Sequence, residues 1–458
     1  MIARISMSMD GQSFKVRPWF EWLTWLLLAA SCCYLVLSLL AYGMGEPFSG
    51  HAFIHPMRMQ PPFADLRYLA ANAECGVELD AYYAGRVVGC DPSGRTYPFD
   101  YPPMSIWLGR FLQVQGSHVP VIAMSSGLVL ILCIVLGLKS CLGASWQWRL
   151  LSSGVLMGYP LQQVLERGNL DVFLLLFFLL LAYLLSLRFK SSLVGLMNAG
   201  IAALISFMLV SLKLYPIFGL AALLVQSSLG RPSGLATSRI FSLDKFAVLF
   251  GSVLGLMATF PFLRGMNTVA KEGGLRSHGL LAFGYMNNTL IDAFGLDSAR
   301  VLIKALVLIK LASLLLGLYL AWKARLHEAL MRCWQSWTPQ ANVFSQILFV
   351  MMSAVWLGCY VTTINIDYRF LFLFPWLGLL ARVASMSSSS LQQKRLAAGL
   401  IVSLLVVFWV PLLQWGYTDF GMKLITFAEP LTEFVLIPLC AASLVYLLIQ
   451  HTFSTFRV

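Results

Sequence analysis

The chain has 458 residues, of which 59% are hydrophobic and 11% are charged, and its mean hydropathy is +0.78. Such a chain cannot cover a water-soluble surface, and its apolar runs of roughly twenty residues match the hydrocarbon thickness of a bilayer. We therefore predict an all-α polytopic membrane protein. The formal charge of +12 would suggest nucleic acid in a soluble protein. Here it fits the excess of Lys and Arg in cytoplasmic loops, so we expect membrane lipids and no nucleic acid as partners.

The apolar runs predict about twelve transmembrane helices in one integral membrane domain, residues 1–458. The expected spans lie near residues 19–42, 118–138, 147–164, 170–187, 196–212, 214–228, 245–263, 299–322, 343–364, 368–384, 396–415 and 431–450. The first run follows a basic tail and is too long for a signal-peptide core, so we interpret it as a retained helix with a cytoplasmic N-terminus. Large external loops are expected at 43–104 and 264–298.

The topology depends on whether residues 196–228 form one span or two. A division at Lys213-Leu214-Tyr215-Pro216 places every basic loop on the same side as the basic N-terminal tail, as the positive-inside rule requires. Pro216 supports the division, since proline lacks an N–H and disfavours helix at the preceding residue. We therefore predict two spans here. Both termini are then expected on the cytoplasmic side of the plasma (inner) membrane.

Ionisable residues gather on the predicted external side. They are Asp65, Asp80 and Asp100 in the first loop, Glu166, Arg167 and Asp171 in a tight turn, Lys213 at the break, Arg276 and His278 in the second loop, and Asp367 with Arg369 in a later turn. Charges at membrane depth are costly, so they usually face a bundle interior or an aqueous cavity and pair with each other or with a ligand. A carboxylate and several cations on one face suggest a base beside an anionic leaving group.

Short motifs follow one another at these positions. They are Ala64-Asp65-Leu66-Arg67-Tyr68, Cys90-Asp91-Pro92, Asp100-Tyr101-Pro102-Pro103, Arg167-Gly168-Asn169-Leu170-Asp171, Lys213-Leu214-Tyr215-Pro216, Asn287-Asn288-Thr289-Leu290 and Asp367-Tyr368-Arg369-Phe370. In type and order they resemble the polyprenyl-phosphate-dependent glycosyltransferases of the GT-C superfamily, specifically glycosyltransferase family 87. Arg167 stands where many members carry Gln, and Asn288-Thr289 replaces Gln-Ser. The resemblance therefore implies the class of enzyme and not the sugar or the acceptor.

The resemblance implies a GT-C-like helix bundle whose active site is extracytoplasmic. Asp65 in the first loop is the candidate general base, a role that can supply roughly a hundredfold or more in rate. Candidates for holding the donor phosphate are Lys213, Arg276, His278 and Arg369, and candidates for further substrate contacts are Tyr101, Asn169, Asn288, Asp367 and Tyr368. The expected partners are a polyprenyl-phosphate sugar and a lipid or glycan acceptor. No cofactor and no metal are expected.

Each candidate also has a structural interpretation. Asp65 is also placed to cap the helix that follows Pro61-Pro62-Phe63-Ala64, and Lys213 is placed to extend its ammonium to water along an apolar surface. The 166–171 segment would then be a turn in which Asn169 bonds to backbone. Cys75 and Cys90 both fall in the first external loop. In an oxidising periplasm they would close a loop of about fifteen residues, worth about 3 kcal/mol in the chain-entropy model.

Two other classes fit a polytopic chain. A secondary transporter or flippase would share the spans and buried charges, but it should show broken helices in corresponding halves, and the sequence indicates one break, at 213–216. A non-catalytic assembly factor for envelope glycans would keep the topology and would not need Asp65 or the cations. An enzyme requires Asp65 to lie beside Lys213 and Arg369 in the fold.

Overall fold

The computed structural model describes residues 17–44, 63–74, 102–143, 145–187, 192–225, 243–260, 277–278, 296–362, 365–413 and 431–454. The helices up to the middle of the chain are α1 (Pro18–Gly43), α2 (Ala64–Glu74), α4 (Pro103–Phe111), η1 (Gly116–His118), α5 (Val119–Leu142), α6 (Gln147–Leu156), α7 (Tyr159–Arg167), α8 (Asp171–Ser186), α9 (Ser192–Leu212), α10 (Pro216–Val225) and α11 (Leu243–Thr259). Those that follow are α13 (Leu296–Lys323), α14 (Leu326–Gln335), α15 (Pro339–Thr362), η4 (Asp367–Leu373), α16 (Phe374–Ser385), α17 (Leu391–Leu413), η5 (Thr432–Leu436) and α19 (Ile437–Ser454).

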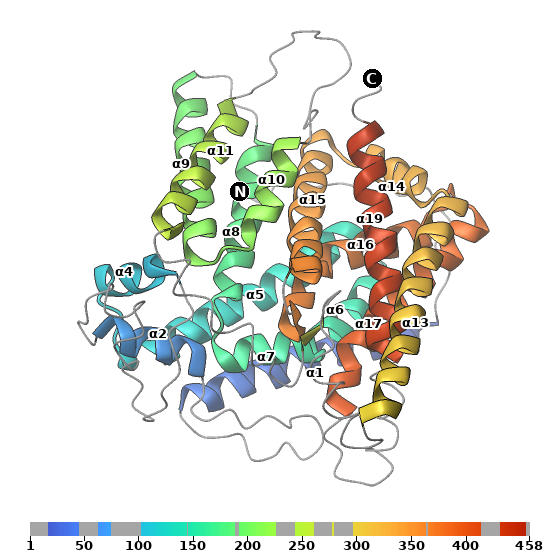
Figure 1. Ribbon diagram of the computed structural model, residues 1–458, viewed down its shortest axis with the longest axis horizontal. Helices are drawn as coiled ribbons and strands as arrows, with labels where there is room; N and C mark the ends of the chain where they lie inside the picture. The colour runs from blue at the N-terminus through green and yellow to red at the C-terminus, as the bar shows by residue number, and fades with distance from the viewer. Residues whose placement is uncertain are drawn as a thin grey trace.

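Two very short strands accompany the helices. β1 (Ser277–His278) pairs antiparallel with β2 (Asn365–Ile366), with Ser277 opposite Ile366 and His278 opposite Asn365. In Figure 1, α9, α15, α19 and α13 are drawn roughly upright, whereas α1 and α5 run across the view below α9. The architecture is thus essentially all-helical, as predicted.

Within the described ranges, seven helices are long and apolar enough to cross a membrane. They cover Pro18–Ala41, Gly116–Leu142, Leu193–Leu212, Lys304–Lys323, Ala341–Val361, Leu391–Trp409 and Thr432–Thr452. These correspond to the predicted spans 19–42, 118–138, 196–212, 299–322, 343–364, 396–415 and 431–450. The chain is therefore a multi-pass helical membrane protein.

The other five predicted spans differ from the observed helices. The run 147–164 is divided into α6 and α7, because Gly158 is extended and Pro160 opens a new helix. α7 and α8, the latter expected at 170–187, form one bent pair with an angle of 109° between them. The runs 214–228 and 245–263 give helices of only 10 and 17 residues, and 368–384 begins with the 3-10 turn η4. Ten helical residues reach about 15 Å, half of the hydrocarbon core.

The predicted break at 213–216 is confirmed. α9 ends at Leu212 and α10 begins at Pro216, which needs no N–H partner at the first helical position. The second helix of this pair packs on α15, whose Ala341–Val361 segment is one of the two most buried spans. Trp356 in the second half of this segment is fully buried. The break therefore lies against the centre of the bundle.

Small residues bring α9 and α11 into close contact. Gly251 and Gly255 are four apart on α11, and a Cβ on Gly251 would lie 2.1 Å from the backbone oxygen of Ala203 on α9. Small residues at this spacing let two helix backbones approach within a membrane. Gly251 is thus required by the packing of these two helices.

Candidate functional site

The site is built where α2 meets the turn between α7 and α8. Phe63, just before α2, has a φ of 58°, and its N–H donates to the backbone oxygen of Glu166 at 2.7 Å. Gly168 ends α7 with a φ of 60°, a conformation that glycine adopts without strain. A Cβ at Gly168 would also lie 3.1 Å from the Cβ of Phe63. The two turns therefore lock together and fix α2 against α7, in the lower part of Figure 1.

Because α2 packs against α7 in this way, the side chain of Asp65 in the first turn of α2 faces the α7–α8 turn. Arg167 donates from Nε to both carboxylate oxygens at 3.1 and 3.0 Å, and from Nη2 to Oδ1 at 2.8 Å. The amide nitrogen of Asn169 donates to Oδ2 at 2.6 Å. These bonds run to side chains from a distant segment, whereas an N-cap would accept from the backbone of its own helix. The side chain of Asp65 is only 10% exposed.

Asn169 links Asp65 to the break between α9 and α10. Its side-chain oxygen accepts from the ammonium of Lys213 at 2.9 Å and from the backbone N–H of Asp171 at 3.0 Å. The bond to backbone agrees with the structural interpretation of this turn, and the bonds to Asp65 and Lys213 go beyond it. One buried amide thus has a carboxylate on one side and an ammonium on the other.

Lys213 turns inward and does not extend to water. Its ammonium forms an ion pair with Asp171 Oδ1, and both residues are at least nine-tenths buried. Each of these two charges needs the other, because a single buried charge in this position would have no opposite charge to offset its loss of hydration. Carboxylates and cations therefore alternate from Arg167 through Asp65 and Lys213 to Asp171.

Arg369 reaches the same cluster through an aromatic ring. Tyr215 donates its hydroxyl to Asp171 Oδ1, and the guanidinium of Arg369 lies 4.7 Å from the centre of the Tyr215 ring. The ammonium of Lys213 lies 5.7 Å from that ring centre. An aromatic face attracts cations electrostatically, so Tyr215 positions both. The structure thus groups Asp65, Lys213 and Arg369, the three residues that the sequence analysis required an enzyme to bring together.

The remaining candidates fall into two groups. The β1–β2 pairing puts the backbone of His278 beside Asn365, just before Asp367 and Tyr368 in η4, so these segments are neighbours. Their side-chain contacts lie outside the described part of the structure. The predictions for Tyr101, Arg276, Asn288 and the Cys75–Cys90 disulfide also concern residues that are outside the described ranges.

Sequence reasoning missed three polar residues. It assigned no site role to Tyr215, although this residue follows Lys213 by only two positions. It also passed over Lys310 on α13 and Glu433 on η5, which are buried and interact electrostatically. The Lys310 ammonium lies 5.4 Å from the ring centre of Phe434. An ionisable residue inside an apolar run is the signal that should have identified this pair.

Among the described residues, no group of three or more His, Cys, Asp or Glu side chains is arranged to bind a metal ion. The groups available for chemistry are the carboxylate of Asp65 and the cations beside it.

Comparisons with protein-family models, curated proteins and solved structures each give no match.

Proposed function

We propose that the chain is a membrane glycosyltransferase that transfers a sugar from a polyprenyl-phosphate donor to a lipid or glycan acceptor. The sugar is a hexose or pentose, with a mannose-like sugar favoured by the resemblance. The active site faces the extracytoplasmic side of the inner membrane, in a twelve-span topology with both termini cytoplasmic. The observation that carries the proposal is the buried cluster in which Asn169 joins Asp65 to Lys213.

Asp65 acts as the general base in this proposal. The carboxylate has about four acceptor sites. Arg167 and Asn169 occupy about three of them with N–H groups, which leaves room for an acceptor hydroxyl. Asp65 takes the hydroxyl proton while the acceptor oxygen bonds to the anomeric carbon from the face opposite the phosphate. The bond from that carbon to the phosphate oxygen breaks, and its electron pair leaves with the polyprenyl phosphate, so the configuration inverts.

The cations stabilise the leaving group. Negative charge grows on the bridging phosphate oxygen in the transition state, and preorganised donors that meet this charge lower the barrier. Lys213 and Arg369 are held around Tyr215 in the same cluster as Asp65, which suits this role. Arg167 and Asn169 are positioning residues, since they orient the Asp65 carboxylate.

One observation favours a transporter as the second candidate. The structure has a second broken helix, the α7–α8 pair, and its turn contacts the α9–α10 break through Lys213. Discontinuous helices that meet at buried polar groups are typical of substrate sites in secondary transporters. The sequence analysis identified only one such break. A transporter would bind an anionic solute at Lys213 and would not form a glycosidic bond.

The test is transfer of radiolabelled sugar from a panel of polyprenyl-phosphate sugars to membrane-extracted acceptors. The purified proteins are wild type, Asp65→Asn and the control Glu74→Gln, which changes a carboxylate at the other end of α2, where Glu74 accepts from the Gly116 N–H at 2.7 Å. We expect transfer by wild type and the control, and none by Asp65→Asn. A fully active Asp65→Asn enzyme would remove the assigned base. No transfer by any protein, with solute uptake into proteoliposomes, would replace the enzyme with the transporter.

A further inference from the structure

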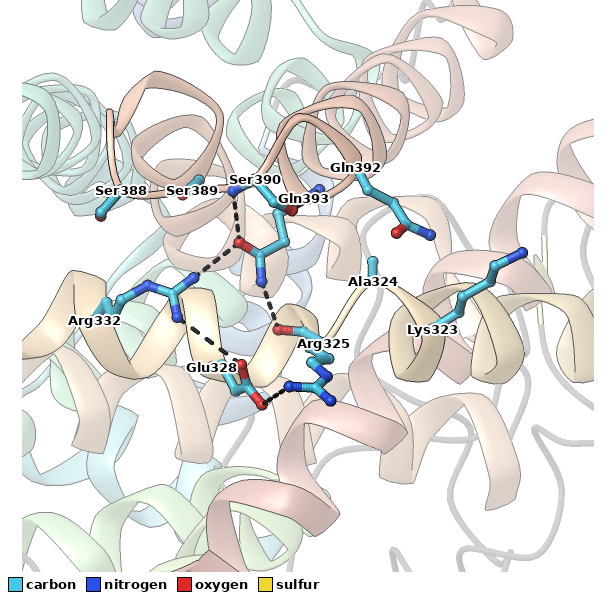
Figure 2. A pocket seen from close by; sticks show the side chains of 10 residues that line it. All are labelled: Lys323, Ala324, Arg325, Glu328, Arg332, Ser388, Ser389, Ser390, Gln392 and Gln393. Atoms are coloured by element: carbon cyan, nitrogen blue, oxygen red, sulfur yellow. Dashed lines mark hydrogen bonds and ion pairs between the residues drawn. The ribbon is translucent and has the colours of Figure 1, made fainter.

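A second polar site lies at the junction of α13, α14 and α17. A cavity of about 540 Å³ opens there, and Figure 2 shows side chains from all three helices around it. Figure 1 places α14 near the top of the view, whereas α2 and α7 are near the bottom. The cavity is therefore separate from the Asp65 cluster.

Gln393 builds the frame of this cavity. It is buried in the first turn of α17, its Oε1 accepts from Arg332 Nη2 at 2.9 Å, and its Nε2 donates to the backbone oxygen of Arg325 at 3.1 Å. Arg325 has a φ of 50°, where α13 ends and the chain turns into α14. Gln393 thereby connects this bend and the last turn of α14 to the start of α17.

The lining is positively charged. Lys323, Arg325 and Arg332 all line the cavity, against a single carboxylate from Glu328, which leaves two positive charges among these four residues. Glu328 lies 3.5 Å from Arg325 Nη1 and 4.0 Å from Arg332 Nη1. Its carboxylate partly neutralises those two groups. The Nε–H of Arg332 is buried and donates to no partner in the described structure.

The start of α17 adds donors for an anion. Ser390 and Gln393 form a capping box, with Ser390 N–H donating to Gln393 Oε1 at 3.0 Å and Gln393 N–H donating to Ser390 Oγ at 3.2 Å. The capping box uses these two N–H groups, so what the helix offers an anion is the partial positive charge of its N-terminus. Ser389 also lines the cavity, is 6% exposed, and its hydroxyl has no partner among the described residues. A buried hydroxyl without a partner is costly, and a water or an oxygen of a bound ligand would relieve this cost.

We propose that this cavity binds a phosphate group. A phosphate oxygen accepts from Ser389 near the positive end of the α17 helix dipole, and Lys323 and Arg332 balance its charge. Arginine suits this ligand because its fixed fork of N–H groups matches phosphate oxygens.

The phosphate has two chemical sources, a free phosphate compound or an anionic lipid headgroup. Lys323 ends the membrane span Lys304–Lys323, and the cavity also contains the residues that lead into the span Leu391–Trp409. The cavity thus lies at the ends of two membrane-crossing segments, at the depth where headgroups are found. The experiment separates these sources.

Full-length protein in neutral detergent is dialysed against radiolabelled inorganic phosphate. The same protein in nanodiscs of phosphatidylcholine with phosphatidylglycerol is released and its retained lipids are counted by native mass spectrometry. The variants are Ser389→Ala, Lys323→Gln and Arg332→Gln. Arg395→Gln is the matched control, because Arg395 is exposed on the same helix and does not line the cavity.

We expect Lys323→Gln and Arg332→Gln to weaken binding about tenfold and Ser389→Ala about fivefold, with Arg395→Gln unchanged. Ser389→Ala should keep or raise the unfolding temperature, since no bond is lost and an unpaired buried hydroxyl is removed, so it remains informative if Arg332→Gln fails to fold. Binding of inorganic phosphate would assign a soluble ligand, and retention of phosphatidylglycerol alone would assign a headgroup. The proposal would be overturned if Arg395→Gln lost as much binding affinity as the cavity variants. It would also be overturned if the wild-type protein held neither inorganic phosphate nor phosphatidylglycerol.

Discussion

Arg167 holds Asp65 through a forked ion pair that joins positions 102 residues apart. Two nitrogens of one guanidinium bond to both oxygens of one carboxylate, a geometry that fixes direction as well as distance. Lysine cannot reproduce this fork. The orientation of the Asp65 carboxylate is therefore set by the Arg167 guanidinium together with the Asn169 amide.

Replacing Arg167 should destabilise the protein through the charge that is left behind. We expect Arg167→Gln to lose about 1–3 kcal/mol of unfolding free energy, because Asp65 remains largely buried without its cation. Asp65→Asn in the same chain should restore part of the loss. Thermal unfolding of the two single variants and the double variant measures this coupling. Additive losses would mean that the ion pair contributes nothing to stability.

Lys213 and Asp171 should show a larger effect, because both are buried more deeply. Lys213→Met leaves the Asp171 carboxylate without its cation, and we expect the free energy of unfolding to fall by about 3–5 kcal/mol. Adding Asp171→Asn should recover much of it. Lys323→Met removes an exposed lysine, and its free energy of unfolding should stay within about 0.5 kcal/mol of the wild-type value. Equal losses from the two lysine variants would contradict the burial of Lys213.

Two glycine substitutions should act in opposite directions. Gly251→Ala places a methyl group against the backbone of Ala203 and should cost about 1–3 kcal/mol as α9 and α11 separate. Gly200→Ala, on α9 with nothing within 4 Å, should stabilise by about 0.5–1 kcal/mol through lower backbone entropy in the unfolded chain. Unfolding temperatures in one detergent compare the pair. Stabilisation by both would show that the helices do not meet at Gly251.

Stability should fall in mild acid because of His327 on α14. Burial lowers the pKa of this imidazole from its usual value of 6.5, while the nearby Glu328 acts weakly in the opposite direction. The folded state then binds a proton less readily than the unfolded state. The stabilisation is complete above pH 6.5 and is lost as the pH falls toward the lowered pKa.

The measurement is the unfolding temperature of wild type and His327→Gln between about pH 5 and pH 8. We expect the wild type to lose more stability than the variant in the acidic half of this range. The variant serves as the control for the titrating groups that do not interact with His327, which excludes His451. Parallel curves would show that the imidazole is as easily protonated in the fold as in water.

The long spans were predictable because hydrophobic run length is a direct physical requirement of the bilayer. Run length fails where the chain bends inside an apolar stretch, as at Gly158 and Pro160 between α6 and α7. A hydropathy profile carries no information about a change in the direction of the chain. The break at Pro216 was found because proline and the distribution of basic loops gave independent signals.

The residues of the site could be predicted from the sequence, but their arrangement in space could not. Asp65, Asn169 and Lys213 were identified as separate polar positions, because charged groups near membrane depth need partners. The pairing of Asp65 with Arg167 depends on the docking of α2 onto the α7–α8 turn, which no local pattern encodes. Tyr215 was missed because a tyrosine near an apolar run is usually an interface anchor.

The 102-residue separation between Asp65 and Arg167 also has a consequence during synthesis. At about 5–20 residues per second, the ribosome needs roughly 5–20 s to make the second partner after the first. Until then the Asp65 segment must wait with its carboxylate in water, and Lys213 emerges later still. The bonds that join Asp65, Asn169 and Lys213 can form only after the first three of the seven long apolar helices have been made, and Arg369 joins the cluster later. These bonds would therefore report that the chain up to the α9–α10 break has assembled.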